Sequence, residues 1–218
     1  MQLTKEQIQR IEAYLNIKQV HYIDVRIEIL DHMILDIENL LLQEYSFEDA
    51  LKITISKWNK NLDTTSSIYL GHAYVKPKPI IEKLKGTMKK HAIIMWVIFI
   101  ISMIAMALFK LEIKLPNSNF YDALAKSVLY ASSVILLIIY FLIYKTKQKT
   151  SYRFLYESQV LPIVIFSFLF GTTMLDFNGS IEFLKVMMVA YGITAIPFGI
   201  KLYKKHLFAV KQYTLKCN

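Results

Sequence analysis

The stretch from Ala92 to Phe109, AIIMWVIFIISMIAMALF, runs for 18 residues without a charged side chain. An α-helix rises about 1.5 Å per residue, so a bilayer core of about 30 Å requires about 20 apolar residues. Buried helices of a soluble protein are the alternative, but the chain has too little amphipathic sequence to cover four apolar helices. Three similar stretches follow at 127–144, 158–175 and 183–200, and the pattern predicts membrane spans at about 91–109, 124–144, 158–176 and 183–202.

The composition of the whole chain also favours a membrane protein. Of its 218 residues, 55% are hydrophobic and only 20% are charged. Soluble domains are about 45–50% apolar, with about a quarter of their residues charged. This balance argues against an ordinary soluble enzyme and against a disordered chain. The single cysteine, Cys217, excludes an intrachain disulfide and a cysteine-based zinc site.

The net charge of +9 is unevenly distributed along the chain. Residues 1–75 carry seven basic and eleven acidic side chains, a net charge of −4, so the remainder carries +13. A protein that binds nucleic acid needs a basic face on its soluble part, and this soluble part is acidic. We therefore expect no nucleic-acid partner. The basic side chains flank the predicted spans, where anionic lipid headgroups are the simpler partner.

The placement of these basic residues predicts the orientation of the spans. Fifteen Lys and Arg residues lie just before the first predicted span, between the second and third, or after the fourth, against four elsewhere beyond residue 75. Lys and Arg are enriched on the cytoplasmic side of membranes. Both termini are therefore expected in the cytoplasm. Segments 110–126 and 176–182 are expected outside, the latter with the Asn178-Gly179 turn pair.

Residues 1–62 are predicted to form a small cytoplasmic domain of three helices. Thr4 and Gln7 have the spacing of a capping box, which begins the first helix. Ser46, followed by Asp49, is the expected N-cap of the third helix. The complete prediction is an all-α protein, with this three-helix domain followed by a four-helix transmembrane bundle.

The second helix, predicted from about Val20 to Glu44, carries a heptad-like row of apolar residues. Their separations alternate between four and three, the spacing of a seam that packs against partner helices. The row is therefore the candidate protein-interaction surface, for a cytoplasmic protein or for a second copy of the chain. Its members are Ile23, Ile27, Leu30, Ile34, Ile37 and Leu41.

Residues 63–90 are predicted to be a linker followed by a basic helix at the inner membrane surface. The helix is expected to start at Pro79, which suits a first helical position, and to continue into the first span. Residues 205–218 are predicted to be a cytoplasmic tail. The candidate lipid-contacting side chains are Lys83, Lys85, Lys89 and Lys90.

Three stretches of the N-terminal region carry a family resemblance: Tyr14-Leu15, Glu28-Ile29-Leu30 and the segment SFEDAL at 46–51. At these places the region resembles the HAAS signalling domains, which are three-helix domains found beside transmembrane helices in bacterial proteins. After the third helix the sequence departs from that family, because WNKNL at 58–62 stands where a Gly-containing turn is typical. The whole chain resembles uncharacterised bacterial multi-pass membrane proteins. The resemblance implies a regulatory or scaffolding module in the bacterial cytoplasmic membrane, without catalytic residues.

One row of ionisable residues is a candidate metal site. Glu28, His32 and Asp36 are four residues apart and share one helix face. Carboxylates and imidazole ligate divalent metals, and a histidine between carboxylates can respond to pH. A solvated or inter-helix polar face is the plainer interpretation, and we expect no metal or other cofactor. The sequence has no hydrolase, zinc-protease or nucleotide-binding motif.

Three functions follow from these features. The first is a non-enzymatic regulatory or scaffolding membrane protein whose N-terminal domain binds another protein. The second is a small transporter or export accessory subunit that uses kinks in its last two spans. The third is a metal-dependent membrane enzyme built on Glu28, His32 and Asp36. The residues that favour the second are Pro162, Gly171, Gly192, Pro197 and Gly199.

Overall fold

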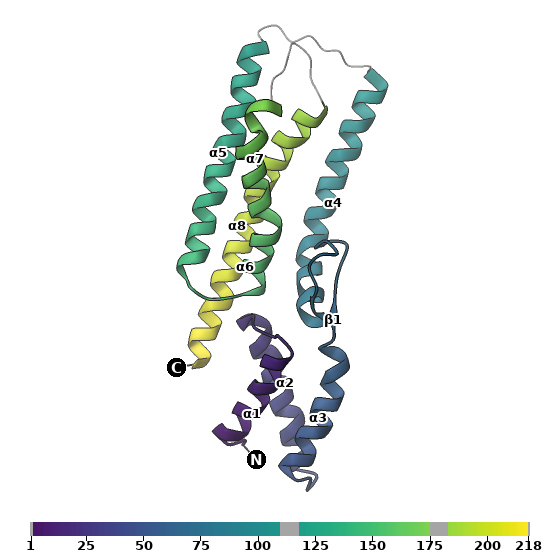
Figure 1. Ribbon diagram of the computed structural model, residues 1–218, viewed down its shortest axis with the longest axis vertical. Coiled ribbons are helices and arrows are strands. Elements are labelled where there is room, and N and C mark those ends of the chain that lie inside the picture. Colours follow the sequence, from purple (N-terminus) through teal and green to yellow (C-terminus); the bar gives the residue numbers. More distant parts are fainter. Residues whose placement is uncertain (1, 110–117, 175–182, 218) are drawn as a thin grey trace. The chain divides into compact units, whose positions relative to one another are not determined.

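The computed structural model describes residues 2–109, 118–174 and 183–217. These residues are mostly helical, which confirms the all-α class. The chain divides into two compact units. Most of its helices are labelled in Figure 1. Unit 1 comprises Met1–Gly86, Gln148–Ser151 and Leu207–Asn218. Unit 2 comprises Thr87–Lys147 and Tyr152–His206.

Unit 1 begins with three helices, α1 (Lys5–Ile17), α2 (Ile23–Leu41) and α3 (Phe47–Asn61). The predicted capping box is present, because the Gln7 amide donates to Thr4 Oγ1 and the Thr4 amide donates to Gln7 Oε1. The Asp49 amide donates to Ser46 Oγ at 3.2 Å and so begins α3. These side chains satisfy amide groups that the first helical turn leaves without partners.

Two arginines connect α1 to its neighbours. Arg26 of α2 donates to the Asn16 side chain at 2.7 Å and to the Glu12 carbonyl at 3.2 Å. Arg10 of α1 binds the Glu48 carboxylate of α3 through both terminal nitrogens. The guanidinium group of Arg26 thus neutralises partial negative charge near the C-terminal end of α1.

The face of α2 that packs inside unit 1 differs from the predicted seam. Of the six seam residues, Ile37 is buried, whereas the other five are half-exposed. The buried row has a constant spacing of four and consists of Val25, Ile29, Met33 and Ile37. The seam therefore lies beside the buried face, with most of its apolar surface only partly covered.

Residues 63–86 belong to unit 1 rather than forming a bare linker. Strands β1 (Thr64–Thr65) and β2 (Lys76–Pro77) pair antiparallel. Helix α4 (Lys78–Phe109) follows directly, and its continuous course into the first predicted span agrees with the sequence prediction. The compact unit extends beyond the expected boundary at residue 62 because this segment contributes to the core. Its buried residues include Leu70, Ile80, Ile81 and Leu84.

Unit 2 contains the rest of α4 and most of the remaining helices. The helix after residue 150 contains one π-helical turn, η1, and α8 contains Pro197 in its interior. Helix α8 continues through most of the expected tail at 205–218, as far as Cys217, and no Gly or Pro follows Gly199 to break it. The elements are α5 (Ser118–Lys145), α6 (Ser151–Leu155), η1 (Tyr156–Val160), α7 (Leu161–Met174) and α8 (Phe183–Cys217).

Two glycines allow α8 to approach α5 closely. A Cβ atom at Gly192 would lie 2.9 Å from Ser132 Oγ, and one at Gly199 would lie 2.9 Å from Leu136 Cδ2. The Tyr156 hydroxyl, which is buried beside Gly199, donates to the Leu136 carbonyl at 2.7 Å. Small residues at such contacts let helix backbones come together. Figure 1 shows α5, α7 and α8 running alongside one another within unit 2.

One helix segment, Asn119–Lys145 of α5, is long and apolar enough to cross a membrane among the residues that the structure describes. Its mean hydropathy is 2.2 over the most apolar window. One such helix is compatible with membrane association, and it coincides with the second of the four predicted spans. Most of the expected outer segments, with Lys110, Lys114 and the Asn178-Gly179 pair, lies outside the described residues.

Candidate functional site

The structure gives the members of the predicted metal row, Glu28, His32 and Asp36, different surroundings. Glu28 Oε2 lies 3.4 Å from Lys83 Nζ. Asp36 accepts hydrogen bonds from Lys57 Nζ at 2.8 Å and from Trp58 Nε1 at 3.0 Å. The His32 ring lies 6.5 Å from the Trp58 ring, centroid to centroid.

These contacts leave the row without a metal-binding arrangement. Among the described residues, no group of three or more His, Cys, Asp or Glu side chains is placed to hold a metal ion. A single helix face separates such side chains by about 5–6 Å at Cβ, so further ligands would have to come from other helices. The neighbouring helices bring Lys57, Trp58 and Lys83 to the row instead.

The surroundings of Asp36 displace the pKa of its carboxyl group. Partial burial raises the pKa of the carboxyl, but the hydrogen bonds from Lys57 and Trp58 together lower it by more. The resulting pKa lies below the usual value of 3.8. Asp36 is therefore a charged anchor that fixes the Trp58 indole and ties α3 to α2.

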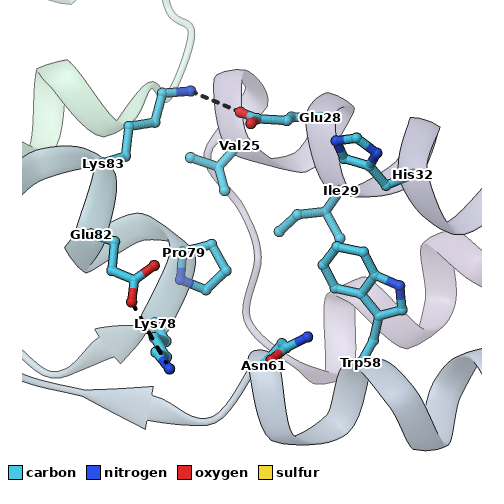
Figure 2. Close-up of a pocket in the computed structure, with 10 residues that line it drawn as sticks. All are labelled: Val25, Glu28, Ile29, His32, Trp58, Asn61, Lys78, Pro79, Glu82 and Lys83. Carbon is cyan, nitrogen blue, oxygen red and sulfur yellow. Dashed lines mark hydrogen bonds and ion pairs between the residues drawn. The ribbon is translucent and has the colours of Figure 1, made fainter.

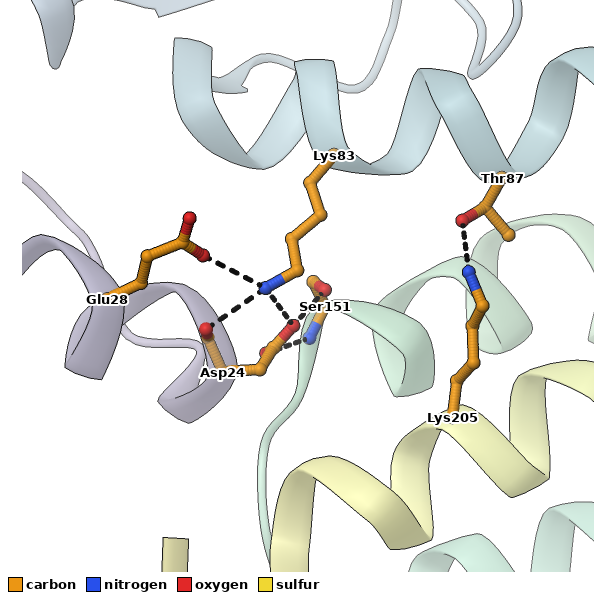
Figure 3. Close-up of polar contacts among 6 residues, drawn as sticks. All are labelled: Asp24, Glu28, Lys83, Thr87, Ser151 and Lys205. Carbon is orange, nitrogen blue, oxygen red and sulfur yellow. Dashed lines mark hydrogen bonds and ion pairs between the residues drawn. The ribbon is translucent and has the colours of Figure 1, made fainter. Parts of the chain in front are cut away.

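A buried ionic contact in unit 1 involves Asp24, whose side chain is 5% exposed. The Ser151 amide donates to Asp24 Oδ1 at 2.8 Å, and the Ser151 hydroxyl donates to Oδ2 (Figure 3). Lys83 Nζ lies 3.4 Å from Asp24 Oδ2 and donates to the Asp24 carbonyl at 3.0 Å. The adjacent Ile23 amide donates to the Lys149 carbonyl at 3.0 Å. Asp24 thus joins α2, α4 and the segment that leads into α6.

The four candidate lipid-contacting lysines fall into two groups. Lys83 is half-buried, and its ammonium group binds Asp24 and Glu28. Lys85, Lys89 and Lys90 are exposed on α4. Lys83 therefore has an ionic role inside unit 1 that was not expected from the sequence, whereas the other three side chains extend into the surroundings.

A pocket of about 520 Å³ lies next to Lys83, where α2, α3 and the start of α4 meet (Figure 2). Its apolar lining comes from Val25, Ile29 and Pro79, and the Trp58 indole forms one wall. The other lining residues are polar or charged, namely Glu28, His32, Asn61, Lys78, Glu82 and Lys83.

Unit 2 has a second pocket of about 430 Å³ with a different character, since its lining is almost entirely apolar. It lies between α7 and α8, the helices that correspond to the last two predicted spans. The lining residues are Pro162, Ile163, Phe166, Ser167, Met187, Met188 and Tyr191.

Polar contacts at one end of the unit 2 helices involve groups that sequence analysis did not identify. Lys205 Nζ donates to Thr87 Oγ1 at 3.1 Å, as Figure 3 also shows. His206 is fully buried, and its Nε2 lies 2.8 Å from Thr146 Oγ1. Each pair joins α8 to a segment far away in sequence, so no local pattern indicates it.

Comparisons with protein-family models, with curated proteins and with solved structures found no match.

Proposed function

We propose that this chain is a non-enzymatic multi-pass protein of a bacterial cytoplasmic membrane, with four spans at about 91–109, 124–144, 158–176 and 183–202. The observation that carries the proposal is the outward exposure of large apolar side chains along α4, α5 and α7. Trp96, Ile101, Phe141 and Leu169 are each more than 60% exposed. In water these side chains would form an unfavourable surface, whereas lipid tails would solvate them.

The proposed orientation places both termini in the cytoplasm. The excess of Lys and Arg beside the predicted inner ends of the spans supports it. Exposed Lys85, Lys89 and Lys90 would then lie near anionic lipid headgroups, where each basic side chain contributes about 1 kcal/mol of attraction.

We assign unit 1 a regulatory or scaffolding role, as a module that binds a cytoplasmic protein or a second copy of the chain. Support comes from the partly covered seam on α2 and from two exposed apolar residues, Leu35 within α2 and Leu42 at its C-cap. The resemblance of residues 1–62 to HAAS signalling domains forms part of this proposal.

Site-specific photocrosslinking tests the role in the full-length chain within native membranes. A crosslinking residue at Leu35 or Leu42 should give one discrete adduct, either with a defined protein or at the mass of a dimer. The same residue at Lys52, an exposed polar position on α3, is the matched control and should give none. Equal or diffuse adducts at all three positions would contradict an interaction surface on α2.

The alternative is a small transporter or export accessory subunit, and the apolar pocket between α7 and α8 favours it. Such a pocket suits a lipophilic cargo rather than an ion, because its lining has no charged side chain. Flux of a lipophilic fluorescent probe into proteoliposomes would distinguish this function. A rate equal to that of empty liposomes would remove the alternative.

A further inference from the structure

The pocket of unit 1 combines an aromatic wall, an apolar floor and carboxylates from two helices (Figure 2). Trp58 is half-exposed, and its indole N–H is already bound by Asp36, so the ring is fixed in position. Val25, Ile29 and Pro79 cover the space beside it. Three separate elements build this lining, so the pocket depends on the tertiary fold and not on one local turn.

Both carboxylates that line the pocket are loosely paired and well exposed. Glu28 Oε2 lies 3.4 Å from Lys83 Nζ, and Glu82 Oε1 lies 3.9 Å from Lys78 Nζ. A strong charge-assisted hydrogen bond has a length of about 2.7–2.9 Å, so both carboxylates retain capacity to accept. Their side chains are 61% and 64% exposed.

The lysines of the pocket do not make it a site for anions. Lys83 Nζ faces three acceptor oxygens, one from Glu28 and two from Asp24. The lining itself holds two carboxylates and two ammonium groups, and the buried Asp24 carboxylate adjoins Lys83 from outside the lining. This third carboxylate offsets the positive charge of Lys83, so the pocket favours a cation over an anion.

We propose that this pocket binds a small organic cation, a primary ammonium group attached to an apolar body. The ammonium group binds the carboxylate of Glu28, with Glu82 as the second carboxylate of the lining. The apolar body packs on the Trp58 ring and on Ile29 and Pro79. Burial of the apolar body against these side chains adds a hydrophobic contribution to the ion pair with Glu28. This proposal is independent of the function assigned to unit 1 above.

Fluorescence of Trp58 provides the test in the full-length chain, reconstituted in phosphatidylcholine nanodiscs. Trp96→Phe makes Trp58 the only tryptophan. The probes are phenethylammonium, its anionic counterpart 3-phenylpropionate, and neutral 2-phenylethanol. We expect saturable binding of phenethylammonium with a Kd of roughly 0.1–1 mM, as suits a fragment-sized ligand. The other two probes should bind at least about tenfold more weakly.

Matched variants locate the ammonium group. Glu28→Gln should weaken binding of phenethylammonium by about tenfold or more, because a charged acceptor is lost. Glu82→Gln should also weaken the binding of phenethylammonium. This second variant tests the proposal if Glu28→Gln does not fold. Glu44→Gln removes an exposed carboxylate outside the pocket and should leave the Kd unchanged. Absence of saturation, equal binding of all three probes, or full affinity in both pocket variants would each overturn the proposal.

Discussion

Asp24 shows how one side chain can hold together parts of unit 1 that are distant in sequence. Its carboxylate accepts two hydrogen bonds from Ser151 and lies beside the ammonium group of Lys83. The Ser151 amide belongs to the first turn of α6, where intrahelical acceptors are missing. Asp24 therefore acts as a cap supplied by another helix, and its charge favours that helix end.

We predict that Asp24→Asn lowers the free energy of unfolding by about 2 kcal/mol, because it leaves half-buried Lys83 with weaker partners. Trypsin should also cleave faster after Lys149, whose carbonyl is bound by Ile23 in the intact protein. Denaturant titration and limited proteolysis of the reconstituted chain would measure both effects.

Glu28→Gln is the control for this prediction, because it alters the exposed side of the same lysine contact. A surface ion pair contributes about 0–1 kcal/mol, so this variant should remain close to the parent in stability and in cleavage. Equal losses in the two variants would refute the special role of Asp24.

We predict that Asp36 makes the stability of the folded protein depend on pH in the acidic range. Its folded-state pKa lies below the usual value of 3.8, so its contribution is present above that value and is lost as pH falls through the folded pKa. The melting-temperature difference between the parent and Asp36→Asn should be constant above about pH 5 and should shrink toward about pH 3. A melting-temperature difference that widens as the pH falls would contradict a lowered pKa of Asp36 in the folded protein.

Residue-scale features were predictable where the cause is local. The Thr4 and Ser46 caps could be predicted because acceptor and donor are three residues apart. The partners of Asp24 could not, since Lys83 and Ser151 are 59 and 127 residues away. The predicted metal row of Glu28, His32 and Asp36 shares a helix face as expected. The side chains that contact this row come from neighbouring helices, so the sequence of α2 alone does not identify them.

At the scale of elements, α2 shows that periodicity alone does not distinguish the face buried within unit 1 from the neighbouring seam. Its apolar residues cover several sides of the helix, and both the seam and the neighbouring row fit a helical repeat. Helix α2 packs against α1 and α3, and its buried row consists of Val25, Ile29, Met33 and Ile37. The sequence predicts the helix and its amphipathic nature, but the partner helices select the buried row.

The ends of some elements could not be predicted from the sequence. Residues 205–217 contain no residue that breaks a helix, and α8 continues through them. The β1–β2 pair has only two residues in each strand, too few for an alternating pattern. Its register pairs Thr64 with Pro77 and Thr65 with Lys76.

The glycines of α8 and α4 provide an element-scale prediction. Gly199→Leu should destabilise the packing of α8 on α5 by about 2 kcal/mol, because Leu136 and buried Tyr156 occupy the space. Gly86→Leu is the matched control, since a Cβ there meets no described atom within 4 Å. The control should be neutral or slightly stabilising. Thermal unfolding in detergent would compare them, and equal stability of the two variants would contradict close packing at Gly199.

At the scale of the molecule, the chain combines an acidic N-terminal region with strongly apolar helices. The sequence predicts the all-α class because apolar runs and helix caps are local signals. The structure adds the two compact units and assigns residues 63–86 and 148–151 to the first of them. Only long-range contacts determine that grouping, so composition and charge cannot reveal it.

The central claim, that the chain crosses the membrane with its N-terminal region inside, can be tested by single-cysteine labelling. Cys217→Ser removes the one native cysteine, and new cysteines then replace Lys52, Lys114 or Asn178. A membrane-impermeant maleimide applied to intact spheroplasts should label Lys114→Cys and Asn178→Cys. It should label Lys52→Cys only after permeabilisation. Labelling of Lys52→Cys in intact spheroplasts, or equal protection of all three sites, would contradict the account.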